Sequence, residues 1–152
     1  MLARLTCAEG CTMIEWKKAE TERNVTMKFE KIHHVAIIAS DYEVSKAFYT
    51  EVLELPIIRE NYRAERDSYK LDLKLGESEI ELFSFPNPPQ RKSGPESVGL
   101  RHLCFYVEDV EATVAELNRK GVETEPIRLD DYTNKKFTFF KDPDGLPLEL
   151  HE

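Results

Sequence analysis

Apolar and polar residues alternate along several short segments of this chain. In residues 34–39, Val35, Ile37 and Ala39 share one face, and His34 lies on the other. Because side chains of a strand point alternately to its two faces, this pattern predicts a half-buried strand. The same alternation recurs in residues 79–83, 102–107 and 147–151. We therefore expect strands whose apolar faces need a cover.

Two helices are predicted to supply that cover. The first starts at Ser40 and Glu43, which have the spacing of a capping box, and has an apolar stripe of Val44, Phe48 and Val52. The second has Asp109 as its N-cap and ends at Gly121, with a stripe formed by Val110, Val114 and Leu117. Each helix begins about seven residues after a histidine, His34 or His102.

Further strand-like runs follow each helix. They are residues 57–58, 69–75 and 79–85 in the first half, and 122–127, 137–140 and 146–151 in the second. Asp142-Pro143-Asp144-Gly145 is a strong turn signal between the last two. Each half is thus predicted to be βαβββ, which makes the fold class α+β.

The division of the chain follows from where these patterns stop. Residues 86–100 contain four of the eight prolines and are expected to be a connector between module one, 28–85, and module two, 101–152. Residues 1–26 show no alternation and are interpreted as an extension. Residues 27–152 are then a single domain of ordinary size.

Candidate chemistry appears twice, at one spacing. Glu81 follows His34 by 47 positions, and Glu149 follows His102 by the same number. Each of the four stands on a strand opposite an apolar face, where a carboxylate is costly unless it is paired or bound to a metal. A hydrogen-bonded histidine or a solvated glutamate is the ordinary interpretation of a single case. Repetition favours a metal site.

Neighbouring residues are weaker candidates. His33 is predicted to point to the face opposite His34. Glu79 and His151 share the ligand faces but lie near strand ends, and Cys104 is expected to fill space beside His102. The stretches 63–68 and 132–136, with Asp67 and Lys135, are either exposed loops or contacts for an anionic substrate.

Composition limits the function classes. A net charge of −8 argues against binding to nucleic acid, and no run of 18 apolar residues exists to span a membrane. The three cysteines have neither disulfide nor zinc-ribbon spacing, which favours a reducing, cytoplasmic setting. No phosphate loop, dinucleotide fingerprint or nucleophile elbow is present. A small-molecule substrate is expected.

The chain resembles the vicinal-oxygen-chelate superfamily and, within it, the glyoxalase I-like proteins. The resemblance covers residues 28–152. It rests on the segments His33–Ile37, Ala47–Tyr49, Ile80–Leu82, Arg101–Leu103 and Asp142–Gly145 with Leu148–Leu150.

The resemblance implies two βαβββ modules that form a cupped mixed sheet around one divalent metal. The ligands would be His34, Glu81, His102 and Glu149, with Ni, Zn, Co, Mn or Fe as the metal. It also implies a homodimer, in which a site can draw its halves from two subunits. Glu149 would be the main base and Glu81 its partner.

Three functions remain open at this point. The first is a glyoxalase I-like lyase or isomerase, such as a lactoylglutathione lyase, that acts on an α-hydroxycarbonyl or hemithioacetal through a metal-stabilised enediolate. The others are a non-haem iron dioxygenase and a binding protein for antibiotic resistance. The family's glutathione-contacting arginine and asparagine are replaced here by Ile38 and Phe85, which argues against lactoylglutathione itself.

Overall fold

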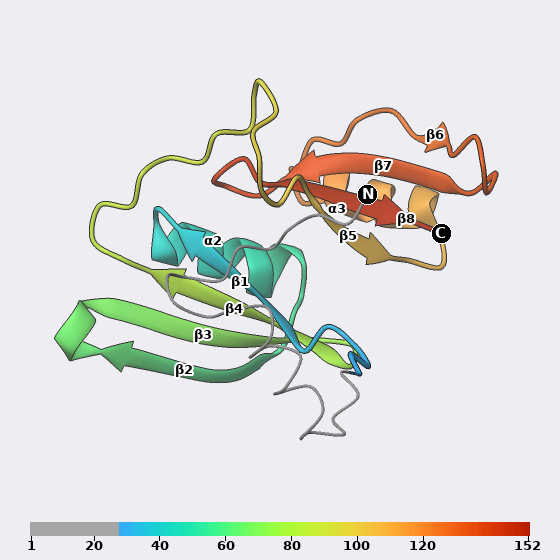
Figure 1. Cartoon of the computed structure of the whole chain (residues 1–152). Coiled ribbons are helices and arrows are strands. Elements are labelled where there is room, and N and C mark those ends of the chain that lie inside the picture. The colour runs from blue at the N-terminus through green and yellow to red at the C-terminus, as the bar shows by residue number, and fades with distance from the viewer. Residues whose placement is uncertain (1–27) are drawn as a thin grey trace, which may run out of the picture. The chain divides into compact units, whose positions relative to one another are not determined.

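The structure is a computed structural model that describes residues 28–152. Residues 32–152 form one compact unit, and the predicted extension, residues 1–26, lies outside the described residues. The first half of this unit contains β1 (His34–Ala39), α2 (Tyr42–Ala47), the π-helical turn η1 (Phe48–Val52), β2 (Ile57–Arg63), the 3-10 turn η2 (Ala64–Arg66), β3 (Ser68–Leu75) and β4 (Ser78–Ser84). The second half contains β5 (Leu103–Tyr106), α3 (Val110–Arg119), β6 (Arg128–Leu129), β7 (Lys136–Lys141) and β8 (Pro147–His151) (Figure 1).

The two halves repeat one topology. Their four-stranded sheets have the orders β1-β4-β3-β2 and β5-β8-β7-β6, and the first pair of strands in each order is parallel. The register repeats as well, since Glu81 lies opposite Ala36 and Glu149 lies opposite Cys104. These findings confirm the predicted α+β fold of two βαβββ modules.

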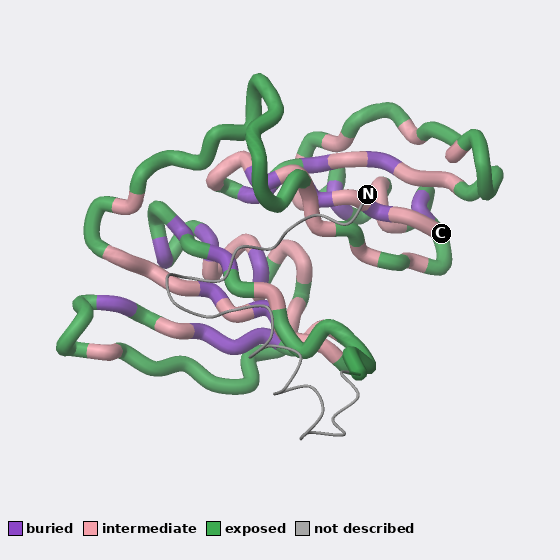
Figure 2. Tube along the Cα trace, viewed as in Figure 1, coloured by how far each residue is buried: buried purple, intermediate pink, exposed green. Residues whose placement is uncertain are grey.

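The predicted strand faces are confirmed. Apolar residues on the predicted core faces are buried, among them Ile37, Ile80, Leu82, Leu148 and Leu150 (Figure 2). The four candidate ligands on the opposite faces are exposed or only partly buried. Helix α2 contacts β4, and α3 contacts β7. The helices and the apolar faces form the core, so the ligand candidates remain on the uncovered face of each sheet.

Equivalent aspartates cap the two helices. The carboxylate of Asp41 accepts a hydrogen bond from the Val44 amide, and that of Asp109 accepts one from the Ala112 amide. Asp109 was predicted, but Ser40 was the wrong cap. Both the amide and the hydroxyl of Ser40 donate instead to the Asp144 carboxylate, a contact between modules that local sequence does not reveal.

The buried face of the first helix also differs from the prediction. Val44 is exposed, and the buried stripe is Tyr42, Ser45 and Tyr49. Tyrosine can occupy these positions because its hydroxyl finds an acceptor: Tyr42 donates to Glu60 and Tyr49 to the buried Asp142. The latter bond joins the first module to the predicted turn at 142–145.

One predicted strand is wrong. Residues 122–127 form no regular strand, and β6 covers only Arg128–Leu129. The segment still approaches β7, because the Glu125 amide donates to the carbonyl of Phe139. Pro126 lacks an N–H group and cannot extend this ladder. In the described part of the chain, no helix is long and apolar enough to cross a membrane.

Candidate metal centre

The first predicted pair, His34 and Glu81, comes together on neighbouring strands. His34 Nε2 lies 3.8 Å from Glu81 Oε2, with the side chains 43% and 15% exposed. Parallel pairing of β1 with β4 places Glu81 two residues beyond the partner of His34 and on the same face. The imidazole is therefore open to a ligand, while the carboxylate is largely enclosed.

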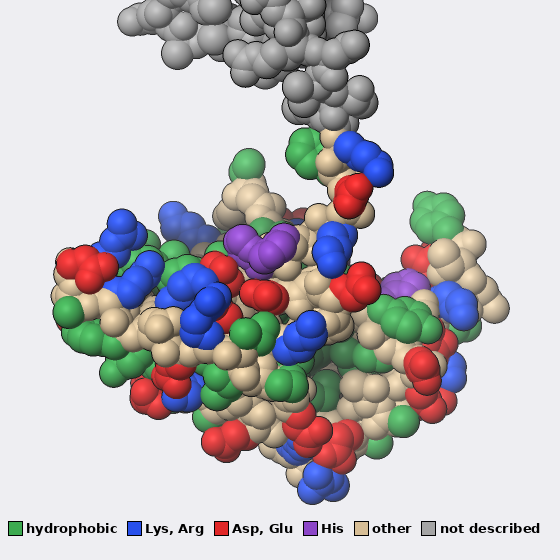
Figure 3. Space-filling model, turned by 90° about the horizontal axis from the view of Figure 1, so that it is seen from below, with side chains coloured by type: hydrophobic (Ala, Val, Ile, Leu, Met, Phe, Trp, Pro, Cys, Tyr) green, Lys and Arg blue, Asp and Glu red, His purple; other side chains and the backbone are tan. Residues whose placement is uncertain are grey.

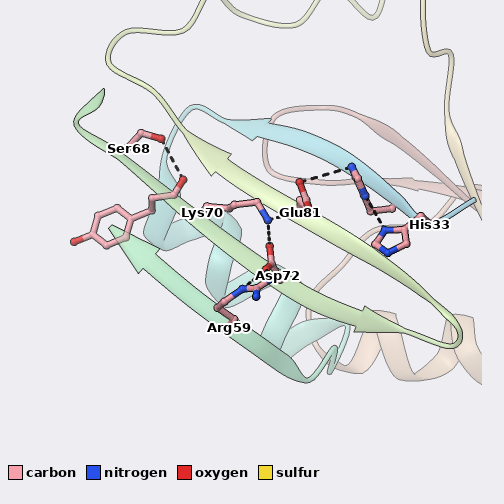
Figure 4. A network of polar contacts seen from close by, with 8 residues as sticks. His33, Arg59, Ser68, Lys70, Asp72 and Glu81 are labelled. Atoms are coloured by element: carbon pink, nitrogen blue, oxygen red, sulfur yellow. Dashed lines mark hydrogen bonds and ion pairs between the residues drawn. The ribbon is translucent and has the colours of Figure 1, made fainter. Parts of the chain in front are cut away.

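Glu81 is the end of a row of alternating charges that continues through Lys70 and Asp72 to Arg59 (Figure 4). Lys70 Nζ lies 2.8 Å from Glu81 Oε1 and 2.5 Å from Asp72 Oδ1. Asp72 is completely buried, and Arg59 Nε donates to its other oxygen at 2.7 Å. Although burial acts in the opposite direction, the hydrogen bonds from Lys70 and Arg59 lower the pKa of the Asp72 carboxyl. This carboxylate thus stays ionised between two cations.

His33 does not simply point away from His34, as the alternation predicted. Its Nδ1 lies 2.9 Å from Nδ1 of His34, because β1 starts only at His34 and does not constrain the preceding residue. His34 can donate an Nδ1 proton to His33, which leaves Nε2 with a lone pair toward Glu81. His33 is thus a neighbour that can orient the ring.

The second pair, His102 and Glu149, is tighter. His102 Nε2 lies 2.9 Å from Glu149 Oε2, with side chains 28% and 12% exposed. Phe139 is the cross-strand partner of Glu149 and packs edge-on against the His102 ring. Desolvation, the charge of Glu149 and a hydrogen bond to it raise the pKa of the Cys104 thiol to about 11, which keeps this thiol protonated at neutral pH.

Arg101 gives His102 a different environment from that of His34. Its Nη1 lies 3.1 Å from His102 Nδ1. Because guanidinium only donates, Nδ1 accepts here and Nε2 carries the proton that Glu149 accepts. A metal at Nε2 would replace this proton, and Nδ1 would then become a donor and release Arg101.

The two pairs do not meet within one chain. Among residues 28–152, no three His, Cys, Asp or Glu side chains gather into a group that could hold a metal. Figure 3 shows histidines at two separate places on one face of the molecule. Each module therefore presents half of the predicted ligand set.

The donor atoms of each pair fit a divalent ion. Bonds of about 2.1 Å at right angles place neighbouring ligand atoms about 3 Å apart, close to the spacing of His102 and Glu149. The distance between His34 and Glu81 is larger, at 3.8 Å. Because the His34 side chain is 43% exposed, it has room to approach the carboxylate when a metal binds. Two imidazoles and two carboxylates suit Zn, Ni, Co, Fe or Mn.

The weaker candidates lie around these pairs or away from them. Glu79 is the register partner of His34, and His151 stacks on Phe137. Asp67 accepts a hydrogen bond from the hydroxyl of Tyr62 in an exposed turn, and Lys135 lies in an exposed turn before β7. Neither stands beside a histidine–glutamate pair, so they are not grouped with the candidate ligands.

Sequence reasoning missed the network of Arg59, Lys70 and Asp72. A signal was present, because the alternation of Leu71, Leu73 and Leu75 places Lys70 and Asp72 on the ligand face. Arg63 is also notable: its guanidinium lies over the rings of Phe83 and Phe85, as Arg128 does over Phe137 and Phe139. Both modules thus have an arginine over two phenylalanine rings, although the rings lie on β4 and just beyond it in the first module and on β7 in the second.

Comparison with known proteins agrees with this geometry. Residues 31–150 match the family described as Glyoxalase/Bleomycin resistance protein/Dioxygenase superfamily. The uncharacterized proteins YwkD of Bacillus subtilis and YaeR of Escherichia coli are 61% and 59% identical; the matches cover 83% and 81% of this chain and 99% and 96% of theirs. The structure of a glyoxalase family protein from Enterococcus faecalis is 58% identical with a TM-score of 0.77, over 83% of this chain and 100% of that one.

More distant relatives have named reactions. A lactoylglutathione lyase of Schizosaccharomyces pombe is 27% identical, and the match covers 82% of this chain and 48% of the lyase. The metallothiol transferase FosB of Staphylococcus epidermidis is also 27% identical, over 82% of this chain and 83% of the transferase. Human methylmalonyl-CoA epimerase is 25% identical, over 80% and 73%.

Proposed function

We propose, from the premise that this chain belongs to the Glyoxalase/Bleomycin resistance protein/Dioxygenase superfamily, that it is a metal-dependent lyase or isomerase of the glyoxalase I type. Its substrate is an α-hydroxycarbonyl compound or a hemithioacetal. The observation that carries the proposal is the pair of repeat-related contacts, His34 with Glu81 and His102 with Glu149. Together they supply the complete set of four ligands.

Two chains build each metal site in this proposal. Because the pairs stay apart within one chain, the pair of His34 and Glu81 is completed by His102 and Glu149 of a second copy. Exposed apolar side chains on the ligand faces support this contact: Ile38 is 54% exposed and Tyr106 77%. These two residues occupy equivalent repeat positions, and a two-fold axis that pairs unlike modules would repeat any contact between them on the other side of the dimer.

The chemistry divides between the metal and Glu149. A divalent metal, when bound, polarises two neighbouring substrate oxygens and acidifies the C–H bond between them. Glu149 takes that proton from one carbon and returns it to the next. In the described part of the chain the only ion-pair partner of Glu149 is His102, so no lysine or arginine holds this carboxylate in place. Glu81 is the partner carboxylate.

The surroundings of the site favour a substrate other than the glutathione adduct. Ile38 and Phe85 stand where a glutathione-using enzyme of this family would have an arginine and an asparagine. Phe85 is stacked on Phe83 and lies beneath the Arg63 guanidinium, so the surface offers an aromatic face and a cation rather than an amide. A smaller or different thiol adduct of a 2-oxoaldehyde fits this surface better.

Metal loading followed by a substrate panel tests the proposal. Protein loaded separately with Ni, Co, Mn, Fe and Zn should hold one equivalent per chain by elemental analysis. The loaded forms should isomerise hemithioacetals made from several thiols and 2-oxoaldehydes, with poor turnover of the methylglyoxal–glutathione adduct. Absence of bound metal would defeat the proposal, and efficient turnover of the glutathione adduct would defeat its substrate argument.

A further inference from the structure

The third strand of each sheet gives the two glutamates opposite surroundings. Asp72 on β3 is the cross-strand partner of Glu81, whereas Phe139 on β7 is the partner of Glu149. Lys70 lies two residues before Asp72 on the same face of β3, and Phe137 lies two residues before Phe139 on the same face of β7. The repeat has therefore preserved the ligands while placing a charge network beside only one of them.

Lys70 is held in place by Asp72. The Asp72 carboxylate is fully buried, so its ionised form requires donors, and Lys70 and Arg59 supply them on separate oxygens. The Lys70 side chain is 23% exposed, and its ammonium also lies 5.8 Å from the ring centroid of Phe83. These contacts define one position for Nζ, and in that position it donates to Glu81 Oε1.

The two oxygens of Glu81 consequently have different roles. Oε1 accepts from Lys70 at 2.8 Å, and Oε2 is the atom that faces His34 Nε2 at 3.8 Å. Rotation of the carboxylate would break a charge-assisted hydrogen bond in a largely enclosed site, where such bonds are strong. Only one oxygen therefore remains for a metal.

We propose that Lys70 is a positioning residue that locks Glu81 as a fixed, one-oxygen ligand, an inference that rests on the proposed function. Asp72 holds Lys70, and Lys70 holds Glu81. The first module therefore maintains the coordination geometry of the metal. Glu149, which has no such tether, is the ligand that can leave the metal and carry a proton. Lys70 does not touch the substrate in this assignment and acts through Glu81.

Two substitutions on one strand give a matched test. Lys70→Met removes the ammonium and keeps the apolar stem, while Lys74→Met makes the same change four residues along β3 on the same face. Lys70→Arg keeps a cation that can donate to both carboxylates. Each full-length protein is titrated with Co²⁺ against a chelator, and the visible absorption spectrum of the Co²⁺-loaded form is recorded.

Loss of a residue that orients a ligand typically weakens metal binding by about 10- to 100-fold. Lys70→Met should show this loss and an altered Co²⁺ spectrum, Lys70→Arg should restore most of both, and Lys74→Met should match the natural protein. An unchanged affinity and spectrum in Lys70→Met would overturn the role of Lys70 while leaving the metal site intact. If the natural protein itself binds no Co²⁺, the proposed function fails and the role of Lys70 fails with it.

A folding control keeps the result interpretable. Thermal unfolding of the metal-free proteins shows whether Lys70→Met is itself folded. If it is not, Lys70→Met combined with Asp72→Asn removes the cation and its buried anion together, and the same Co²⁺ measurements apply. A weaker affinity and an altered spectrum in this double variant support the role of Lys70, and natural values overturn it.

Discussion

The two halves of the candidate centre share their candidate ligands and differ in the residues that contact those ligands. In the first module, Glu81 is tied through Lys70 to the buried Asp72, and His34 contacts another imidazole. In the second module, Glu149 lies opposite Phe139, and His102 contacts Arg101. The internal repeat thus supplies two equivalent histidine–glutamate pairs, and the third strand of each sheet gives them different neighbours.

The comparison assigns different tasks to two chemically identical side chains. A carboxylate that accepts from a fixed ammonium is a stable ligand. Glu149 lies beside Phe139, with His102 as its ion-pair partner in the described residues and no lysine or arginine to hold it, and in our proposal it is the carboxylate that changes partners. The difference lies in Lys70 and Asp72 against Phe137 and Phe139, which occupy corresponding places in the two sheets.

The largest expected effect separates the two glutamates. Glu149→Gln should lower kcat by about 10²–10⁴-fold while most of the metal is retained, because glutamine keeps a ligating oxygen but is a far weaker base. Glu81→Gln should lower kcat per bound metal much less. Steady-state assays normalised to metal content measure both. Equal losses in kcat would remove the functional difference between the halves.

The histidines provide the next test. His34→Ala and His102→Ala should each sharply lower metal occupancy, since each removes a donor atom. His33→Ala removes only a neighbour of His34 Nδ1 and should weaken binding by at most roughly 10-fold, the smaller end of the range for residues that orient ligands. Elemental analysis after dialysis compares the three. An equal loss in all three would refute the assignment of His34 as the ligand.

A stability comparison tests the charge network against its aromatic counterpart. Asp72→Asn should lower the free energy of unfolding by about 1–3 kcal/mol, because the hydrogen bonds from Lys70 and Arg59 lose their buried, charged acceptor. Phe139→Leu should cost less than about 1.5 kcal/mol, as hydrophobic replacements of similar size usually do. Denaturant unfolding of the metal-free proteins measures both values, and a larger cost for Phe139→Leu would contradict this ranking.

The same substitution has a pH signature. The pKa of Asp72 is lowered in the folded protein, so its stabilisation is present above its ordinary pKa of about 3.9 and is lost as pH falls through the lower folded value. Asp72→Asn should therefore flatten the fall in stability below about pH 4. An unchanged acid dependence would show that Asp72 is not the titrating group.

The smallest effect is expected from residues 1–26, which lie outside both repeats. A chain that starts at Met27 should keep the metal content and thermal unfolding midpoint of the full chain. Loss of solubility or of metal would show that these residues belong to the domain after all.

The sequence was sufficient for the repeat, the strand faces and the cap at Asp109, because each depends on residues close together in the chain. It failed for Ser40, whose partner Asp144 belongs to the other module, and for Val44, where tyrosines with hydroxyl partners replaced the aliphatic stripe. The predicted strand at residues 122–127 was also wrong, because Pro126 lacks the N–H group that a strand ladder needs.

The candidate site was predictable to the same extent. Spacing identified the four residues His34, Glu81, His102 and Glu149, and the structure places them as two pairs. Spacing cannot reveal whether one chain or two must supply the pairs, because both arrangements use the same residues. The link from Lys70 to Glu81 depends on the register of β3 with β4, which becomes visible only in three dimensions.

Mixing two inactive variants tests the shared metal site most directly. His34→Ala and His102→Ala chains are combined in equal amounts, unfolded and refolded together, and assayed for bound metal and turnover. Random pairing makes half of the dimers mixed, each with one intact site, so about a quarter of the natural metal content and activity should return. If every site is formed within a single chain, the mixture will remain as empty and inactive as the separate variants, and that result would contradict the account.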